Sequence, residues 1–367
     1  MADAMIRLDG VTKRFPGTDA PAVDGLSFEI PEGELAVLVG PSGCGKTTTL
    51  KMINRIIEPS GGRILIDGQD VASRPAWRLR RDIGYVIQQI GLFPHKTIAS
   101  NIATVPRLLG WDKQRTNDRV DELLELMSLE PTMRDRYPAE LSGGQRQRVG
   151  VARALAADPP VMLMDEPYGA VDPLVRGRLQ DQLLDLQQEL GKTIVFVTHD
   201  IDEAIKLGDR IAILNVGGVL EQYDTPAAIL REPANDFVAS FLGDERGLKR
   251  LSLIPVTQAE LDPGPVVSAD ATVDEAKRVA QDKDADWLGV LDGDRMRGWL
   301  WVADLDPGRR VGEHDTRDFR VWIDHTASLR TAVDAIVNTR NQVAVVYEGS
   351  TYRGILYIEQ VAAELVS

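Results

Sequence analysis

Hydrophobic residues follow two patterns along the first 243 positions of the chain. Three short runs are continuously apolar: Leu35–Val39, Val161–Met164 and Ile194–Val197. Such runs are typical of parallel strands that are buried on both faces. Between them, apolar residues recur at helical spacing over 120–127 and 179–190, which indicates amphipathic helices. This alternation predicts an α/β domain with a mainly parallel sheet.

The C-terminal part of the chain repeats itself at a constant offset of 56 residues. The matched pairs are Ala271-Thr-Val with Ala327-Ser-Leu, Leu288–Gly293 with Ala344–Gly349, and Arg297-Gly298 with Arg353-Gly354. Each copy predicts an amphipathic helix, a strand, a glycine-containing turn and a second strand, so that two copies bury their apolar faces on each other. The alternative is a chance likeness of two short αβ stretches.

A polar segment separates these two parts. Residues 243–250 contain two glycines and show no sustained periodicity, so we place a domain boundary there. We therefore expect one domain over 1–243 and a second over 250–367, whose copies span about 252–308 and 309–367.

Composition and charge narrow the range of partners. The 367 residues include 42 Lys and Arg against 56 Asp and Glu, a net charge of −14, which argues against a nucleic-acid partner. Residues 244–367 alone carry 22 acidic and 15 basic side chains, so the second part is the more acidic per residue. The one cysteine excludes an internal disulfide, and no stretch approaches the about 18 apolar residues of a spanning helix. We expect an intracellular protein; if it works at a membrane, another chain supplies the span.

A phosphate-binding loop follows the first apolar run. Gly40-Pro-Ser-Gly-Cys-Gly-Lys-Thr47 fits the G-x-x-x-x-G-K-[ST] pattern, and a helical run over Thr47–Ile57 follows it. Its backbone N–H groups and the helix N-terminus would surround a phosphate, Lys46 would reach the β and γ phosphates, and Thr47 would ligate Mg²⁺. The alternative is a glycine-rich turn that only joins a strand to a helix. The residues expected to contact the nucleotide here are Gly40, Ser42, Gly43, Cys44, Gly45, Lys46, Thr47 and Thr48.

Two further motifs point to hydrolysis of the nucleotide. The apolar run Val161–Met164 ends in Asp165 and Glu166; Asp165 would hold the hydration shell of Mg²⁺, and Glu166 would polarise the attacking water. Leu141-Ser-Gly-Gly-Gln145 opens a predicted helix, so that Ser142 and the N–H groups of Gly143 and Gly144 form a second anion site.

With these motifs, the chain resembles the ATP-binding subunits of ABC transporters over residues 1 to about 243. The resemblance implies a P-loop NTPase domain with a helical subdomain, ATP and Mg²⁺ as cofactors, and a head-to-tail homodimer with ATP between the Gly-rich loop of one subunit and the Ser142–Gln145 segment of the other. It also implies that Gln88 senses Mg²⁺ and the transmembrane partner, that Asp172 communicates across the dimer, and that His199 contacts the γ-phosphate. Phe15 stands where the family stacks an aromatic ring on adenine; the alternative is a core residue.

Two stretches are similar to one importer subfamily. Tyr85–Ile98, which includes Gln89, and Met52–Pro59 resemble the ATP-binding subunits of importers for glycine betaine, carnitine, choline and proline. This resemblance implies an integral-membrane permease, indirectly a solute-binding protein, and a peripheral position at the cytoplasmic face of the cell membrane. Leu92, Phe93 and Pro94 would shape the groove for a coupling helix of the permease, or else simply pack an internal loop.

That subfamily often carries a pair of CBS modules, and the 56-residue repeat resembles such a tandem α+β pair. Asp304 matches the ribose-binding aspartate of such modules, but Trp301, Tyr357 and Gln360 depart from the nucleotide-binding pattern and put AMP or ATP binding there in doubt. Cyclic di-AMP at a CBS dimer interface, or ionic strength, is the expected regulatory signal.

Three alternatives remain at this point. The chain is an ATPase of another ABC importer, such as a polyamine-type one, or an ABC ATPase of translation or DNA repair that works without a permease. The C-terminal part could instead be a TOBE-like barrel, which the helical stretches at 273–281 and 329–337 argue against.

Overall fold

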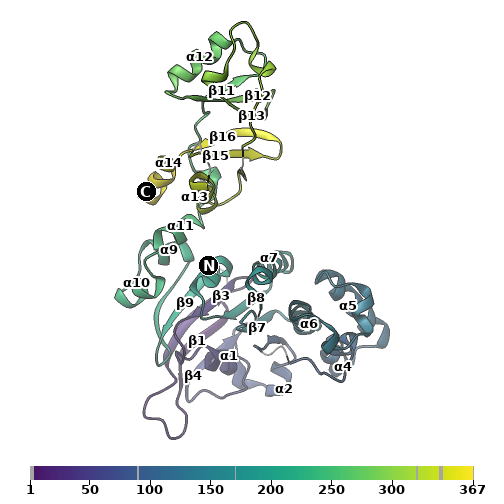
Figure 1. Cartoon of the computed structure of the whole chain (residues 1–367). Helices are drawn as coiled ribbons and strands as arrows, with labels where there is room; N and C mark the ends of the chain where they lie inside the picture. The colour runs from purple at the N-terminus through teal and green to yellow at the C-terminus, as the bar shows by residue number, and fades with distance from the viewer. Residues whose placement is uncertain (1–3, 89–90, 170, 320, 339–341, 367) are drawn as a thin grey trace. The chain divides into compact units, whose positions relative to one another are not determined.

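The computed structural model describes residues 4–88, 91–169, 171–319, 321–338 and 342–366. The chain divides into two compact units, Met1–Gly243 and Asp244–Ser367 (Figure 1). Within the described residues no helix is both long and apolar enough to span a lipid bilayer.

The first unit is built on two sheets. A six-stranded sheet has the order β10-β9-β3-β8-β7-β6, and a four-stranded antiparallel sheet has the order β2-β1-β4-β5. In the larger sheet, the neighbours from β9 to β6 are parallel and β10 is antiparallel to β9. The strands are β1 Ala4–Lys13, β2 Val23–Pro31, β3 Leu35–Val39, β4 Gly61–Ile66, β5 Gln69–Asp70, β6 Ile83–Val86, β7 Val161–Asp165, β8 Thr193–Val197, β9 Arg210–Asn215 and β10 Val219–Asp224.

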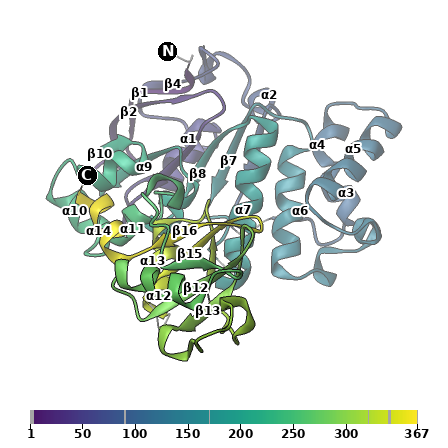
Figure 2. The ribbon, with the colours of Figure 1, turned by 90° about the horizontal axis from the view of Figure 1, so that it is seen from above.

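The expected parallel core is confirmed. Every residue of β3, β7 and β8 is buried, so these strands contribute both faces to the interior. Helices α3 to α6 pack on one another beside this sheet (Figures 1 and 2). The helices of the unit are α1 Lys46–Ile53, α2 Ala76–Leu79, α3 Ile98–Ile102, α4 Thr104–Leu108, α5 Lys113–Leu126, α6 Gly143–Leu155, α7 Pro173–Leu190, α8 Ile201–Leu207, α9 Pro226–Arg231 and α10 Asp236–Leu242.

The helix after the Gly-rich loop is shorter than expected. The sequence predicted a helix to Ile57, but α1 ends at Ile53. Arg55 adopts a left-handed backbone conformation with φ 48°, and the N–H groups of Ile56 and Ile57 both donate to the carbonyl of Lys51. The helix therefore closes with a left-handed residue, a common C-terminal arrangement that sequence periodicity does not reveal.

The second unit contains two small three-stranded sheets, β11-β12-β13 and β14-β15-β16. The 56-residue offset is visible in their registers: β11 pairs Val266 with Gly289, and β14 pairs Trp322 with Val345. The expected helices over 273–281 and 329–337 are α12 and α13. The elements are α11 Arg246–Leu251, β11 Val266–Ser268, α12 Val273–Asp282, β12 Trp287–Asp292, β13 Arg295–Trp301, β14 Trp322–Asp324, α13 Leu329–Asn338, β15 Ala344–Glu348, β16 Thr351–Leu356 and α14 Ile358–Val366.

The two halves of this unit exchange their leading segments, so the contiguous copies 252–308 and 309–367 do not describe the packing. Leu251 and Val256 are buried in the core of the second half, with Leu329 and Leu356. Val311 is buried in the core of the first half. The exchange is reciprocal: the N–H of Val256 donates to the carbonyl of Ala327 (2.8 Å), and that of Val311 to the carbonyl of Ala271 (3.0 Å).

This exchange also changes the expected linker. In the segment 243–250, where we place the domain boundary, α11 begins at Arg246 and packs on α13 and α14 of the second unit. A third apolar cluster joins the two sheets and includes Trp287, Trp299 and Phe319. Two segments of this unit approach each other closely at Gly354, where φ is 146° and an added Cβ would lie 2.8 Å from the carbonyl oxygen of Asp262.

Candidate functional site

The Gly-rich loop joins the end of β3 to α1 and requires its glycines. Gly40 has φ 153°, and a Cβ there would collide with the carbonyl oxygen of Leu214. Gly45 has φ 90°, and a Cβ there would lie 2.6 Å from the carbonyl oxygen of Ala22. Both positions therefore exclude a side chain for steric and conformational reasons.

Lys46 is held at the centre of this loop. Its side chain is buried, and its Nζ donates to the carbonyl oxygens of Gly40 (2.7 Å) and Pro41 (3.1 Å). Ser42 and Gly43 are exposed at the outer edge of the loop, whereas Cys44 is fully buried in the core. The Cys44 side chain therefore faces the interior, and only its backbone belongs to the phosphate-binding surface predicted from the sequence.

The hydroxyl of Thr47 reaches the carboxylate that ends β7. Thr47 Oγ1 donates to Asp165 Oδ1 at 2.8 Å. Burial raises the pKa of Asp165, while the bond from Thr47 and the charge of Lys51 oppose the shift. Burial together with the charge of Asp165 also raises the pKa of Tyr85 to about 12. The Thr47 hydroxyl and the Asp165 carboxylate thus place two oxygen atoms of the kind that bind Mg²⁺ next to each other in a desolvated position.

Glu166 lies at the meeting point of three strand ends. Gln88 follows β6, Glu166 follows β7 and His199 follows β8, and these strands are neighbours in the sheet. Gln88 Nε2 donates to Glu166 Oε2 at 3.2 Å, and His199 Nδ1 lies 3.3 Å from the same oxygen. Because parallel strands end at one edge, residues far apart in sequence converge on one carboxylate.

The backbone at Glu166 is strained. It has φ 44°, a left-handed value that is uncommon for a residue with a side chain, and its N–H donates to the carbonyl of Val197 at 3.0 Å. This bond to the neighbouring strand fixes the position of the carboxylate beside His199.

The second predicted anion site is the start of α6. Ser142 is the N-cap: its hydroxyl accepts from the N–H of Gln145 (3.3 Å), and Gln145 Oε1 accepts from the N–H of Ser142 (2.9 Å). Ser142, Gly143 and Gly144 line a surface depression of about 500 Å³ together with Asp172. The structure therefore brings Ser142 and Asp172 to one surface.

Comparisons with known proteins decide what these motifs mean. The family described as "ABC transporter" matches residues 23–169. The osmoprotectant import ATP-binding protein OsmV of Salmonella typhimurium is 45% identical over 99% of this chain and 97% of its own length. The chain belongs to the ATP-binding subunits of ABC transporters.

Two further similarities support this family assignment. The glycine betaine/carnitine/choline transport ATP-binding protein OpuCA of Bacillus subtilis is 51% identical to this ABC subunit over 83% of this chain and 80% of that protein. A solved dimeric ATP-binding cassette in a post-hydrolysis state, bound to ADP and Pi, has 35% identity and a TM-score of 0.55, and covers 60% of this chain and 99% of that one.

The aromatic residue expected at adenine lies outside the core of the ABC subunit. Phe15 follows β1 and is partly exposed, and the Nζ of Lys13 lies 5.2 Å from the centre of its ring. It is absent from the buried cluster of the unit, so the alternative of a core residue does not hold. Thr48 is partly exposed in the first turn of α1.

Sequence reasoning missed a buried carboxylate next to the site of this ABC subunit. Glu203 in α8 accepts a hydrogen bond from Gln180 Nε2 of α7 (3.0 Å) and another from the Thr198 hydroxyl, and burial raises its pKa. It thereby ties α7 to the strand end that carries His199. Asp200 caps α8 with Glu203 at the third helical position, a capping pattern that would have drawn attention to it.

Asn101 is a second residue that sequence reasoning missed, and its side chain forms hydrogen bonds with the loop that follows Gln88. This side chain is fully buried; its Oδ1 accepts from the N–H of Phe93 (2.8 Å), and its Nδ2 donates to the carbonyl of Phe93 (3.2 Å). Phe93 itself is exposed, with the Nζ of Lys96 4.4 Å from its ring centre. Gln89 lies outside the described residues. The loop therefore presents an aromatic ring to its surroundings.

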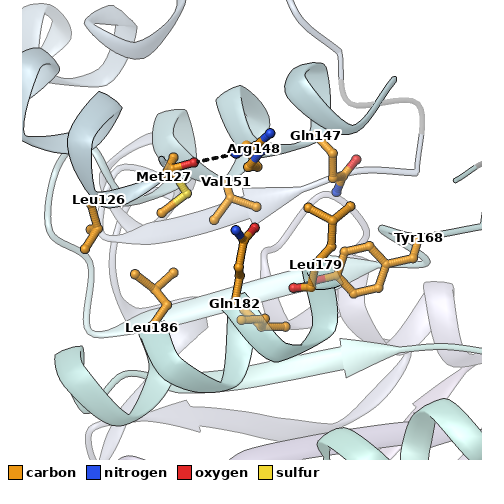
Figure 3. Close-up of a pocket in the computed structure, with 10 residues that line it drawn as sticks. Leu126, Met127, Gln147, Arg148, Val151, Tyr168, Leu179, Gln182 and Leu186 are labelled. Carbon is orange, nitrogen blue, oxygen red and sulfur yellow. Dashed lines mark hydrogen bonds between the residues drawn. The ribbon is translucent and has the colours of Figure 1, made fainter. Parts of the chain in front are cut away.

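A small cavity of about 40 Å³ lies between α6 and α7 of this ABC subunit (Figure 3). Val151 of α6 and Leu179 and Leu186 of α7 line it, and Arg148 donates to the carbonyl of Met127 at its rim (3.1 Å). The contact of α6 with α7 therefore leaves a small gap beside Val151.

Proposed function

We propose that this chain is the energy-coupling ATPase of an importer for quaternary ammonium and related compatible solutes of the glycine betaine, choline, carnitine or proline type. The catalytic part of this proposal rests on one observation. Gln88 and His199 both contact the carboxylate of Glu166, at the edge of the sheet where Lys46 and Thr47 also lie. The solute class is supported by relatives that are named for osmoprotectant, glycine betaine, carnitine and choline transport.

The Gly-rich loop between β3 and α1 is the part of the chain that would bind the nucleotide. The backbone N–H groups of the loop and the ammonium of Lys46 would hold the phosphates of ATP, and Phe15 would stack on adenine. Among the described residues, no cluster of three or more His, Cys, Asp or Glu side chains is arranged to hold a metal ion. The hydroxyl of Thr47 and the carboxylate of Asp165 nevertheless fit Mg²⁺, which prefers oxygen donors and needs few from the protein; Gln88 would complete the set. When bound, Mg²⁺ would neutralise phosphate charge.

Glu166 would act as the general base. Its Oε2 accepts a hydrogen bond from Gln88 and lies 3.3 Å from His199 Nδ1, so the carboxylate is held from two sides. It would accept the proton of the attacking water, and His199 would contact the γ-phosphate. Its strained backbone is consistent with a position kept for chemistry.

A dimer would complete each nucleotide site. Ser142, Gly143 and Gly144 at the start of α6 line one surface with Asp172, and Gln145 holds the N–H of Ser142 there. That surface would receive the γ-phosphate of ATP held by a second copy of the chain, with Asp172 at the contact. The related dimeric cassette bound to ADP and Pi supports this arrangement.

The loop held by Asn101 would bind a permease. Exposed Phe93, with Leu92 and Pro94, would form the groove for a cytoplasmic coupling helix of an integral-membrane permease. The chain would then lie peripherally at the cytoplasmic face of the membrane, and a solute-binding protein would deliver the solute to the permease from the other side.

The second unit would be a tandem CBS pair that regulates transport. Its support is the pair of equivalent sheets and helices at an offset of 56 residues. Asp304 pairs with Arg317 (3.4 Å), whose guanidinium also lies over Trp301, and Gln360 Nε2 donates to the carbonyl of Glu260. These positions are engaged internally, which favours ionic strength or cyclic di-AMP at a dimer interface over AMP or ATP as the signal.

Glu166→Gln tests the catalytic proposal. We expect this variant to bind ATP, to accumulate as a nucleotide-bound dimer and to lose steady-state hydrolysis, while Lys46→Ala weakens nucleotide binding itself. The matched control is Glu130→Gln, an exposed glutamate at the N-terminal boundary of a 3-10 helix. Continued turnover by Glu166→Gln would refute its role as the base.

Transport in proteoliposomes with the permease tests the rest. We expect uptake of glycine betaine or choline and no uptake of putrescine; the reverse result would assign a polyamine-type importer. Truncation after Gly243 should abolish the response of uptake to salt or cyclic di-AMP, and an unchanged response would refute regulation by the second unit.

A further inference from the structure

The C-terminal unit contains an open pocket of about 540 Å³ where its second half meets strand β13 of its first half. Trp322 and Asp324 of β14 and Tyr347 of β15 line one side of it, and Arg295 and Met296 of β13 line another. The volume is in the range of small-molecule sites in proteins. Neither the ATPase nor its dimer, as proposed above, uses this pocket.

Aromatic rings form the wall of the pocket. In the parallel pairing of β14 with β15, Asp324 is opposite Tyr347, and Trp322 lies two residues before Asp324, so the three side chains share one face of the sheet. The ring centres of Trp322 and Tyr347 are 4.5 Å apart. Trp322 is 42% exposed, a high value for so large an apolar side chain. The pocket therefore keeps an aromatic surface in contact with solvent.

The repeat shows that the fold itself does not require these side chains. At the offset of 56 residues, the first half has Val266 in place of Trp322, Leu291 in place of Tyr347 and Ser268 in place of Asp324. The same registers form with the aliphatic residues, since Val267 pairs with Val290 as Ile323 pairs with Val346. The register of the sheet therefore does not depend on the aromatic pair or the carboxylate, although Tyr347 packs on the apolar cluster that joins the two sheets and Trp322 lies against Phe319.

Opposite charges flank the aromatic wall. The hydroxyl of Thr326 (2.6 Å) and its N–H (2.9 Å) donate to Asp324 Oδ1 and lower the pKa of this carboxyl, and His325 Nδ1 lies 3.3 Å from the same oxygen. Arg295 of β13 also lines the pocket; burial raises the pKa of the Tyr347 hydroxyl, and the positive charge of Arg295 opposes that shift. A ligand with one positive and one negative end would match this arrangement.

We propose that this pocket binds a small zwitterion with a methylated ammonium group, such as glycine betaine. The ammonium would lie against the faces of Trp322 and Tyr347, near Asp324, because aromatic rings and carboxylates attract methylated cations. The carboxylate of the ligand would pair with Arg295. The identity of the ligand rests on the proposed import function: the site would report, on the ATPase subunit, how much of the transported solute has accumulated.

A nucleotide is the competing occupant, since a base also stacks on tryptophan and an arginine also pairs with phosphate. The charges favour the zwitterion. Asp324 stands at the aromatic wall, so a polyanion would meet repulsion in this pocket where a zwitterion would not.

Equilibrium dialysis of the full-length chain with labelled glycine betaine tests the proposal without permease or ATP. We expect binding with a Kd of about 1 mM, as suits a partly exposed aromatic site. Trp322→Val and Tyr347→Leu install the residues that the first half carries, so the sheet should persist, and each should weaken binding at least about tenfold. Trp77→Val, at a tryptophan that is 54% exposed in the first unit, is the matched control and should bind as the wild type does.

Ligand analogues and charge variants separate the interactions. 3,3-Dimethylbutanoate has the shape of glycine betaine but no positive charge, and it should bind at least about tenfold more weakly. Arg295→Thr should weaken glycine betaine more than choline, which lacks a carboxylate, and Asp324→Ser should weaken both. Unchanged binding by Trp322→Val, equal binding of the uncharged analogue, or binding of cyclic di-AMP alone would overturn the proposal. Each of these results would leave the ATPase assignment standing, because that assignment is tested by hydrolysis in Glu166→Gln.

Discussion

We expect Val151→Ile to stabilise the ATP-binding unit by about 0.5–1 kcal/mol. Val151 lies on α6, is 8% exposed and borders the cavity of about 40 Å³ between α6 and α7. At about 24 cal/mol per Å³, the whole cavity corresponds to about 1 kcal/mol, and one added methylene contributes about 0.8 kcal/mol when it is fully buried. The two estimates agree because the cavity has room for roughly one such group.

A second valine on the same helix provides the control. Val149 is fully buried and does not line the cavity, so the same substitution there must displace neighbouring atoms. We expect Val149→Ile to destabilise the unit by about 1–3 kcal/mol. The pair therefore separates the effect of free volume from that of the larger side chain, since helix, residue type and added group are the same.

Calorimetry of the full-length chain measures both effects. The transition of the first unit is the one that ATP shifts, because a ligand stabilises the part that binds it. For a unit of this size, Val151→Ile should raise its Tm by about 1–2 °C, and Val149→Ile should lower it. If both variants lower the Tm, α6 and α7 pack without the cavity, and the reasoning is refuted.

Three further predictions address caps, charge and backbone. Gln145→Ala removes the hydrogen bond from the N–H of Ser142 and should lower the free energy of unfolding of the first unit by about 0.5–1 kcal/mol. The measurement is the Tm of this unit without nucleotide, and an unchanged Tm would show that this capping bond does not stabilise the helix. Burial raises the pKa of Glu203 in the folded state, so its contribution to stability is greatest at low pH and falls as the pH rises above about 4.3, the ordinary pKa of a glutamate, and through the raised pKa of the folded state. Glu203→Gln should lose this decline in urea midpoints, and parallel pH profiles of the variant and the wild type would contradict it. Gly354→Ala should destabilise the second unit by about 1–3 kcal/mol, measured by urea unfolding followed by tryptophan fluorescence. The effect should exceed that of Gly349→Ala, where no atom lies within 4 Å of the added Cβ. Equal effects would show that the close contact of the new Cβ with the carbonyl oxygen of Asp262 does not destabilise the unit.

The buried strands could be predicted because each leaves an uninterrupted apolar run. Strands β3, β7 and β8 are buried along their whole length. The sheet of β1, β2 and β4 left no such signal: one face of β1 is largely exposed, and irregular register interrupts its pairing with β2. A bulged strand breaks the alternation of apolar and polar residues on which sequence reasoning depends.

The site was predictable as far as its motifs are local. The loop around Lys46 and the cap at Ser142 are each encoded within a few residues, so their geometry follows from short patterns. The convergence on Glu166 depends on the order of strands in the sheet, which the sequence does not state. Glu203 was missed because its partner Gln180 lies 23 residues away on another helix. Likewise, the 56-residue repeat reveals similar elements, but similarity does not show which core each leading segment enters.

The exchange of leading segments bears on how the chain is synthesised. Leu251 and Val256 leave the ribosome early, but they enter a core whose other members, such as Leu329 and Leu356, follow much later. The core of the first half, in contrast, is complete once Val311 has emerged. A nascent chain therefore exposes these apolar residues after the ATPase unit has been translated and until α14, which supplies Val361 to the same core, has followed. During that interval the chain is most exposed to aggregation and has most need of chaperones.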